Sequence, residues 1–318
     1  MAAEDPPTAL ERAGDAIPVA PEGFRSGFVG IVGRPNVGKS TLINRLVGQQ
    51  VAITSSVAQT TRNCLQGIAT GEQAQLIFVD TPGIHKPHHE LARVLVANAR
   101  NAIDAVDAVL FVVDASVPLG GGDRFVARLL AASPLPVVLA LNKRDRQPPD
   151  CQPLDAGYTE LAQANGWSCC KVSAATGAGL EALQQQLVAQ LPVGPYYYPP
   201  DAVTDRPERF IMAEAIREQV LYQTRNEIPH SVAITIDRIE EAPEQTAIWA
   251  TICVERKSQK GILIGKHGSV LKAIGTAARE RIQAIVAGKV HLELFVRVQP
   301  KWRQSRRQLA ELGYELEA

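Results

Sequence analysis

The chain has 318 residues, and its 33 lysines and arginines balance its 33 aspartates and glutamates, with 46% hydrophobic residues. This length and composition predict two globular domains with ordinary buried cores. The five cysteines lack paired metal spacing, no apolar run approaches the roughly 20 residues of a bilayer span, and the acidic N-terminus lacks a signal-peptide pattern. These features argue against disulfides, a membrane helix and secretion, so we expect a cytoplasmic chain.

The first part of the chain alternates between strand and helix patterns. Residues 1–25 are acidic and rich in Pro and Ala, and we expect a mostly disordered tail there. From residue 26 to about 192, the apolar runs FVGIVG, QLIFVD, AVLFVVD and PVVLALN are typical of buried strands, and LARVLVANARNAI and RFVARLLAA of helices. Repeated strand–helix units predict an α/β domain with a mostly parallel sheet.

A different pattern follows. The segment LPVGPYYYPPD (191–201) has four prolines in eleven residues, which predicts a stiff, extended linker over residues 193–204. We expect Tyr196–Tyr198 to pack between the domains. Over residues 205–318 the segments read as helix (RFIMAEAIREQVLYQT), two strands (SVAITIDRIEEA, TAIWATICVER), two helices around GKHG, a strand (KVHLELFVRVQP) and a closing helix (KWRQSRRQLAELGYE). This α-β-β-α-α-β order predicts a smaller α+β domain.

The segment GRPNVGKS (33–40) fits the phosphate-binding pattern G-x-x-x-x-G-K-[ST] and stands between a predicted strand and a predicted helix, as that pattern requires. Its glycines let backbone N–H groups face phosphate oxygens, Lys39 adds a positive charge, and Ser40 offers a hydroxyl to Mg²⁺. The predicted phosphate-site residues are Gly33, Arg34, Pro35, Asn36, Val37, Gly38, Lys39, Ser40 and Thr41. This motif indicates nucleotide binding without specifying the base.

Two later motifs indicate guanine. In NKRD (142–145), Asp145 can accept hydrogen bonds from guanine N1–H and N2–H₂ together, which adenine cannot offer. Asn142 can reach N7, and the stem of Lys143 can lie over the base. In VSA (172–174), the Ala174 N–H, beside Ser173, can donate to guanine O6. Such a site can reject the wrong base by roughly 10⁴-fold, because its buried polar groups would be left unpaired.

The segment DTPG (80–83) follows the strand QLIFV, so Asp80 is expected to hold Mg²⁺ through water and the Gly83 N–H to meet the γ-phosphate. With Thr81, Pro82 and Ile84 it completes the predicted nucleotide site. Together the motifs resemble the Ras-like GTPases of the translation-factor class over residues 26–192. That resemblance implies GTP hydrolysis to GDP and phosphate.

The resemblance also implies roles for single residues. Thr60 and Thr61 both fit the threonine that ligates Mg²⁺ and caps the γ-phosphate, with Thr61 preferred, so Lys39, Thr61 and Gly83 are the expected catalytic residues and Ser40, Thr61 and Asp80 the magnesium residues. Ile84 stands where many GTPases carry a glutamine, which implies slow unassisted turnover of roughly 10⁻⁴ to 10⁻² s⁻¹. Asn36 matches relatives in which an asparagine helps to hold K⁺.

The motif GKHG (265–268) breaks two helical stretches of the second domain. From Glu255 to Arg307 the chain carries 13 Lys and Arg against 3 Asp and Glu. This surplus suggests a polyanionic partner, although a solvated basic helix face would give the same pattern. A Gly-x-x-Gly match is worth little alone, but its place in this element order and in this basic segment distinguishes it.

Residues 205–300 resemble a type II KH domain, which implies single-stranded RNA passing close to the glycine loop. Ile262, Leu263 and Ile264 are then expected to form the groove floor and core. The residues expected to contact RNA are Arg256, Lys257, Lys260, Ile264, Gly265, Lys266, His267, Gly268, Lys272 and Arg279.

A Ras-like domain followed by a KH domain and VRVQPKWR resembles the Era family of bacterial ribosome-assembly GTPases over nearly the whole chain. The resemblance implies 16S rRNA near its 3′ end and the 30S subunit precursor as partners, with no DNA expected. It also implies a cytoplasmic location with peripheral association at the inner membrane face. A membrane-associated or cell-cycle GTPase whose KH fold binds a protein remains an alternative, whereas NKRD and the lack of an acceptor-substrate motif disfavour a metabolic kinase.

Overall fold

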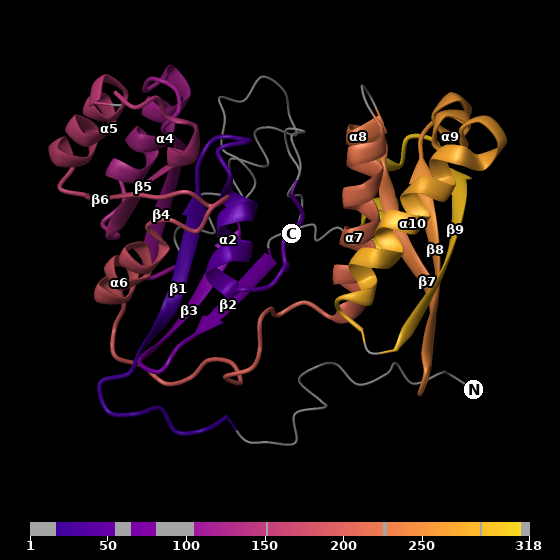
Figure 1. Cartoon of the computed structure of the whole chain (residues 1–318), viewed down its shortest axis with the longest axis horizontal. Helices are drawn as coiled ribbons and strands as arrows, with labels where there is room; N and C mark the ends of the chain where they lie inside the picture. The colour runs from indigo at the N-terminus through magenta and orange to yellow at the C-terminus, as the bar shows by residue number, and fades with distance from the viewer. Residues whose placement is uncertain are drawn as a thin grey trace. The chain divides into compact units, whose positions relative to one another are not determined.

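The computed structural model describes residues 17–54, 65–80, 105–150, 152–224, 228–286 and 288–312. The chain forms two compact units, Met1–Asp205 and Arg206–Ala318, and Figure 1 shows their elements. Within the described ranges, no helix combines the length and apolar character that crossing a membrane requires. The predicted helix over 91–103, the candidate threonines Thr60 and Thr61 and the predicted site residues Thr81, Pro82, Gly83 and Ile84 lie outside the described residues.

The first unit contains a six-stranded sheet in the order β2-β3-β1-β4-β5-β6. Its strands are β1 (Arg25–Val32), β2 (Leu65–Thr70), β3 (Ala74–Asp80), β4 (Ala108–Asp114), β5 (Val137–Asn142) and β6 (Ser168–Lys171). Neighbouring strands are parallel except β2 and β3, so the predicted mostly parallel sheet is confirmed. The sequence did not reveal β2, because LQGIAT is short and carries Gly67 at its centre, and pairing with β3 decides its conformation.

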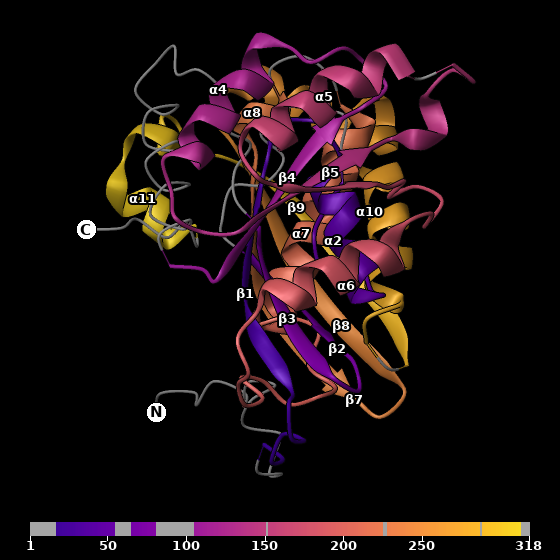
Figure 2. The same ribbon diagram turned by 90° about the vertical axis from the view of Figure 1, so that its left-hand side faces the viewer.

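Helices cover this sheet (Figure 2). They are α2 (Lys39–Val47), α4 (Gly121–Ala131), α5 (Gln152–Ala164) and α6 (Leu180–Gln190), with the 3₁₀ turn η1 (Arg144–Arg146) after β5. On one side, buried residues of α4 and α5, such as Leu130 and Tyr158, pack with Phe111 and Leu139 of the sheet. Because β5 is buried along its whole length and β4 up to Asp114, which is half-buried, their carboxyl ends form a rigid edge on which polar loops can be placed.

The linker lies along the first unit. Tyr196 packs on Phe24 with ring centroids 4.4 Å apart, and Tyr197 packs on Phe28 at 5.2 Å. The buried amide of Gln75 accepts hydrogen bonds from Tyr197 N and Tyr198 N and donates to Tyr198 O. These tyrosines therefore have partners within the first unit, and their packing between the domains stays a prediction.

The end of the linker continues along the edge strand β2. Ile68 N donates to Val203 O at 2.9 Å, and Gln66 N donates to the Asp205 carboxylate at 3.0 Å. Gly67 and Thr204 form an isolated antiparallel bridge. The linker thus supplies partners for backbone groups that an edge strand would otherwise present to solvent.

The second unit has a three-stranded sheet in the order β7-β8-β9. Its elements are α7 (Glu208–Gln223), α8 (Ile228–Ser231), β7 (Ala233–Ala242), β8 (Gln245–Val254), α9 (Lys257–Ile264), η2 (Lys266–Gly268), α10 (Ser269–Gln283), β9 (Lys289–Val298), η3 (Trp302–Gln304) and α11 (Arg306–Glu311). β7 and β8 are antiparallel, and β8 and β9 are parallel. The predicted α-β-β-α-α-β order is confirmed, with the closing helix shorter than expected because η3 interrupts it.

Buried and exposed residues alternate along β9, which shows which face of the sheet packs on the helices. Val290, Leu292, Leu294 and Val296 face the core that α7, α9 and α10 share, while the residues between them are exposed. On the other face of the sheet, Trp302 is buried against Ala233 and Cys253, and its ring N–H donates to Ser231 O. The C-terminal segment therefore covers one end of that face.

Candidate functional site

The phosphate-binding loop joins β1 to α2. Gly38, with φ 99°, precedes α2, and Asn36 also has a positive φ, of 64°. A Cβ at Gly33 would stand 2.3 Å from Val112 O, and one at Gly38 would stand 2.4 Å from Asn142 Nδ2. Glycine is therefore required at both positions by close contacts, and at Gly38 by backbone conformation as well.

Lys39 is the buried charge of this loop. Its side chain is 7% exposed, and its ammonium donates to Gly33 O and Arg34 O, each at 3.2 Å. Burial lowers the pKa of Lys39 to about 8, although the nearby charge of Asp80 acts in the opposite direction. Asp80 ends β3 and is fully buried. Two carbonyl oxygens solvate an ammonium less well than water does, so this position favours an anionic ligand.

Asn142, the last residue of β5, joins two loops. Its Nδ2 donates to Val37 O at 2.8 Å, and its Oδ1 accepts from Ala174 N at 3.0 Å. The side chain is 1% exposed. The Ala174 N–H predicted for guanine O6 is thus used inside the protein, and that predicted contact requires the N–H to be shared or to change partner. The second hydrogen of Nδ2 leaves the predicted N7 contact possible.

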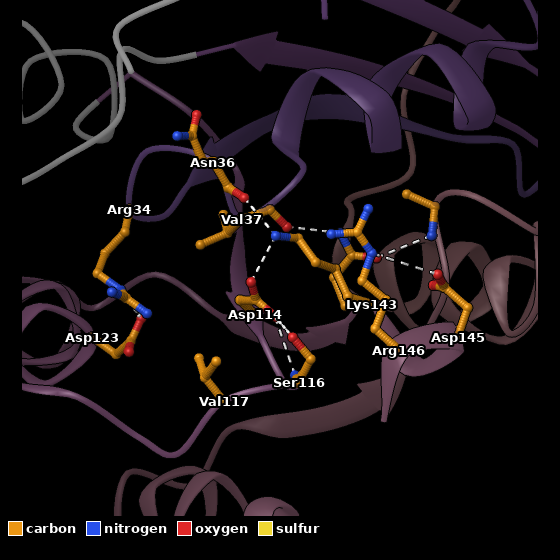
Figure 3. Close-up of polar contacts among 12 residues, drawn as sticks. Arg34, Asn36, Val37, Asp114, Ser116, Val117, Asp123, Lys143, Asp145 and Arg146 are labelled. Atoms are coloured by element: carbon orange, nitrogen blue, oxygen red, sulfur yellow. Dashed lines mark hydrogen bonds and ion pairs between the residues drawn. The ribbon is translucent and has the colours of Figure 1, made fainter. Parts of the chain in front are cut away.

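Lys143 links the phosphate loop to the next strand end (Figure 3). Its ammonium donates to Asn36 O at 2.7 Å and to Asp114 Oδ2 at 2.6 Å. Burial alone would raise the pKa of Asp114, but hydrogen bonds from Lys143 and Ser116 outweigh burial and hold it below its usual value. Because both ends of the lysine are fixed, its stem lies in one place, as the predicted stacking role requires.

Asp145 is oriented by the loop after β6. The hydroxyl of Ser173 donates to Asp145 Oδ1 at 2.6 Å and accepts from Thr176 N at 3.1 Å. Ser173 is 1% exposed, whereas Asp145 is an exposed residue whose side chain is 24% exposed. One carboxylate oxygen is thereby fixed by protein, and the carboxylate retains lone pairs for a ligand.

Sequence reasoning missed three supports of this site. Asp114 was taken only as the end of a strand. Asp123, fully buried at the start of α4, accepts from Arg34 Nε at 2.6 Å, so Arg34 points away from Lys143 (Figure 3). Arg45 of α2 donates to Ala174 O and Ala175 O. The position of Asp114 at the end of an apolar strand, where site residues of parallel sheets gather, was the one available signal.

The GKHG loop of the second unit is defined by its backbone. Gly265, His267 and Gly268 have φ values of 70°, 52° and 78°. A Cβ at Gly265 would stand 2.5 Å from Val270 Cγ2, whereas a Cβ at Gly268 would meet nothing within 4 Å. Gly265 is therefore needed for packing, and Gly268 leaves open space over the loop. A side chain at Gly268 would therefore strain the backbone, because φ is positive, but it would not collide with a neighbour as one at Gly265 would.

The structure places the predicted RNA residues on α9, η2 and α10. Leu263 is buried in the core, Ile264 is half-buried, and Ile262 is 56% exposed, so of the two predicted roles, groove floor and core, only the first is open to Ile262. The exposed members of the predicted set are Arg256, Lys257, Lys266, His267, Lys272 and Arg279, and Lys260 is half-buried. The cations flank the glycine loop on both helices, which makes this surface suited to a polyanion.

We expect Asn142→Ala to lower the free energy of unfolding by about 2–4 kcal/mol, because it leaves both Val37 O and Ala174 N buried without this partner. Denaturant unfolding monitored by circular dichroism measures the change. Asn165→Ala, which removes a single half-buried hydrogen bond to Leu161 O, serves as the control and should cost less than about 1.5 kcal/mol. Equal stability of Asn142→Ala and the wild type would show that the bridge does not hold these loops.

Two family models match the chain: one described as a 50S ribosome-binding GTPase matches residues 28–143, and one described as a KH domain matches residues 227–303. GTPase Era of Rippkaea orientalis is 63% identical over 302 residues, covering 95% of this chain and 96% of the relative. GTPase Era of a Nostoc species is 66% identical, covering 95% of this chain and 93% of the relative.

Two crystal structures are similar along nearly the whole chain. Era in complex with MgGDPNP and nucleotides 1506–1542 of 16S ribosomal RNA has a TM-score of 0.86, 35% identity, and coverage of 92% of this chain and 100% of that chain. A variant of Aquifex aeolicus Era bound to GDP·AlF₄⁻ has a TM-score of 0.87 with the same identity and coverage. With more than 60% identity to GTPase Era across 95% of its length, the chain belongs to the Era family of GTPases.

Proposed function

We propose that this GTPase is a nucleotide-controlled RNA-binding switch of small-subunit ribosome assembly. Its first unit binds GTP with Mg²⁺, and its second unit binds 16S rRNA near the 3′ end in the 30S precursor, where rRNA matures. GTP hydrolysis then releases the RNA. The observation that carries this proposal is the presence of both sites in one chain: the loop around Lys39 with Asn142 and Asp145, and the glycine loop around His267. The similar Era structure contains both MgGDPNP and 16S rRNA.

In the first unit, each predicted role follows from position. Backbone N–H groups between Gly33 and Thr41, apart from Pro35, which has none, surround the phosphates, and Lys39 exchanges its two carbonyl acceptors for phosphate oxygens. Ser40 at the start of α2 and Asp80 at the end of β3 hold Mg²⁺, with Thr61 as the third magnesium residue. When bound by these residues, Mg²⁺ would supply positive charge that offsets the charge of the phosphates. Thr61 and Gly83 act at the γ-phosphate, and Asn36 holds K⁺ beside it.

In the second unit, an RNA strand passes over Gly268, where no side chain fills the space, and its phosphates meet Lys266 and the flanking cations of α9 and α10. The two glycines permit close approach of the sugar–phosphate backbone, and Ile264 contributes apolar surface beside the bases. Because each phosphate contact releases counterions, the affinity should fall with salt concentration.

The linker connects the proposed GTP-binding unit to the proposed RNA-binding unit through hydrogen bonds to β2. β2 begins four residues after Thr61, and its Gln66 and Ile68 are hydrogen bonded to the last linker residues. The second unit begins directly after Asp205. A change at the segment that carries Thr60 and Thr61 that shifts β2 would therefore shift the attachment point of the RNA-binding unit.

We further place the protein in the cytoplasm with peripheral association at the inner face of the cell membrane, where its basic segment meets anionic lipid headgroups. Flotation with anionic vesicles tests this location, and recovery of all protein at the bottom of the gradient would refute the membrane association.

Asp145→Asn tests the choice of base. The amide loses the acceptor for guanine N2–H₂ and gains a donor that suits the C2 carbonyl of xanthine, so GTP should bind on the order of 10²–10⁴-fold more weakly and xanthosine triphosphate more tightly. Competition titration with fluorescent nucleotides measures both. Ser173 should still donate to the remaining oxygen, which keeps the side chain in place. Comparable wild-type affinities for ATP and GTP would contradict guanine selection and favour a kinase.

Asn36 tests the potassium proposal. We expect GTP turnover to be faster in KCl than in NaCl at equal ionic strength. Asn36→Gly should remove this difference, because glycine keeps the positive φ of 64° but lacks the amide oxygen. Phosphate release measured in the two salts reports the effect. The potassium idea is abandoned if the wild type turns over equally fast in both.

Gly268→Asp tests the RNA site. The new carboxylate would occupy the open space over the loop and repel phosphate, so RNA affinity should fall at least tenfold while GTP hydrolysis is retained. Filter binding to a 16S rRNA fragment measures this effect. Gly265→Ala is the contrasting variant: both glycines have a positive φ, but only at Gly265 would the Cβ also collide with Val270 and lower stability further, so melting temperatures of both variants are measured. Unchanged RNA binding by Gly268→Asp would refute this site.

Asp205→Ala tests the coupling. Removing the carboxylate that binds Gln66 N should leave the GTPase rate close to normal and weaken the difference in RNA affinity between the GTP and GDP states. Asp201→Ala, an exposed change in the same linker, is the control. RNA titrations in both nucleotide states measure the difference. An undiminished difference in Asp205→Ala would rule out this path.

A further inference from the structure

One face of the second sheet carries an aromatic side chain that the proposed RNA groove does not use. Trp302 covers the end of this face near Ala233 and Cys253. Farther along β9, Phe295 is 48% exposed, although phenylalanine is usually buried. It lies between His291 and Glu293 on one side and Arg297 on the other, all on the same face of β9 by strand alternation. The exposed ring of Phe295 is therefore a candidate contact for a ligand.

A shallow pocket of about 430 Å³ surrounds this ring. Its lining includes Phe295 and Arg297 of β9, Asp237 of β7, Thr251 of β8 and Lys260 of α9. Lys260 belongs to the helix that leads into the GKHG loop, and Figure 1 shows α9 beside the end of β9. The pocket is therefore continuous with the proposed RNA surface around the edge of the sheet.

Trp249 of β8, the other aromatic residue that a strand contributes to this face, already has partners. Arg238 lies over the Trp249 ring at 5.3 Å, and the ring N–H of Trp249 donates to Glu293 Oε2 at 2.8 Å. Phe295 has no such ring contact among the described residues. Its ring is thus the one available for stacking on this face.

The polar groups of the pocket suit a nucleotide. Lys260 and Arg297 place two cations at its rim, and neither forms an ion pair within the described part of the chain. Asp237 is exposed and oriented by the Thr251 hydroxyl, which donates to its Oδ2 at 2.6 Å. A stacking ring, two phosphate partners and one acceptor for a base N–H make up the recognition set of a single-stranded nucleotide.

We propose that this pocket binds one unpaired nucleobase of the same RNA strand that crosses the GKHG loop, with the base stacked on Phe295. This inference rests on the proposed RNA-binding function and adds a second contact to it. The strand leaves the glycine loop, passes Lys260 at the edge of β9, and places a base on the open sheet face. Arg297 binds the adjoining phosphate, and Asp237 accepts a hydrogen bond from the base edge.

The test uses the full-length protein with GTP analogue and a synthetic RNA of nucleotides 1506–1542 of 16S rRNA, the fragment in the similar Era structure. Fluorescence anisotropy gives the affinity. Phe295→Ala should weaken binding about tenfold, within the range for loss of one stacked base, and Phe295→Tyr should bind as the wild type does. Arg297→Ala should reduce the slope of log affinity against log salt by about one. His291→Ala, exposed on the same strand but outside the pocket, is the matched control.

A series of RNAs, each with one abasic site in the unpaired stretch, locates the base. One abasic site should weaken binding to the wild type by about as much as Phe295→Ala does, and should have no further effect on Phe295→Ala. This non-additivity identifies direct contact, because independent effects would multiply. Melting temperatures of the variants confirm that the exposed substitution leaves the fold intact.

The outcomes separate this inference from the proposed function. If the wild type binds the RNA and Gly268→Asp does not, while Phe295→Ala binds normally and no abasic site couples to it, the pocket proposal is wrong and the RNA-binding function stands. If the wild type does not bind the fragment, both are wrong. If Phe295→Ala binds RNA normally but loses a copurifying protein, the face serves a protein and the nucleobase assignment is wrong.

Discussion

The nucleotide site depends on one buried amide. Asn142 sits at the end of β5, and its side chain holds the phosphate loop at Val37 and the loop after β6 at Ala174. The three segments lie far apart in sequence, and the parallel sheet brings their ends to one edge. Since a buried amide is costly to leave unpaired, the same contact stabilises the fold and fixes the distance between the phosphate and base ends of the site.

Other side chains reinforce that edge without touching a phosphate. Lys143 joins Asn36 to Asp114, and Asp123 fixes Arg34. Among the described residues, Lys39 by contrast donates to two loop carbonyls, and its burial lowers its pKa despite the nearby charge of Asp80. A rigid frame around one poorly solvated ammonium favours a polyphosphate, because the ligand supplies negative charge and acceptors beyond the two carbonyls and the charge of Asp80.

In the first unit, side-chain hydrogen bonds fix the loops of the candidate site, whereas in the second unit the backbone conformation of the GKHG loop does so. Positive φ values at Gly265, His267 and Gly268 turn the chain sharply between α9 and α10 and keep side chains out of the space above Gly268. The linker that precedes this unit is hydrogen bonded to the edge strand β2, which follows the segment carrying Thr61. The two units thus differ in fold and ligand class, yet each exposes backbone at a glycine loop flanked by cations.

The sequence alone determined the family, both fold classes, the phosphate loop and the GKHG loop, because these depend on local residue patterns that few other structures tolerate. It did not determine what Asp114, Asp123 or Arg45 contact, since these partners come from segments that meet only through the sheet. It also did not show that Ile262 is exposed while Leu263 is buried, or that the linker tyrosines pack on Phe24 and Phe28. Periodicity tells which residues avoid water, whereas only the tertiary structure decides which surface, or which distant backbone group, each side chain meets.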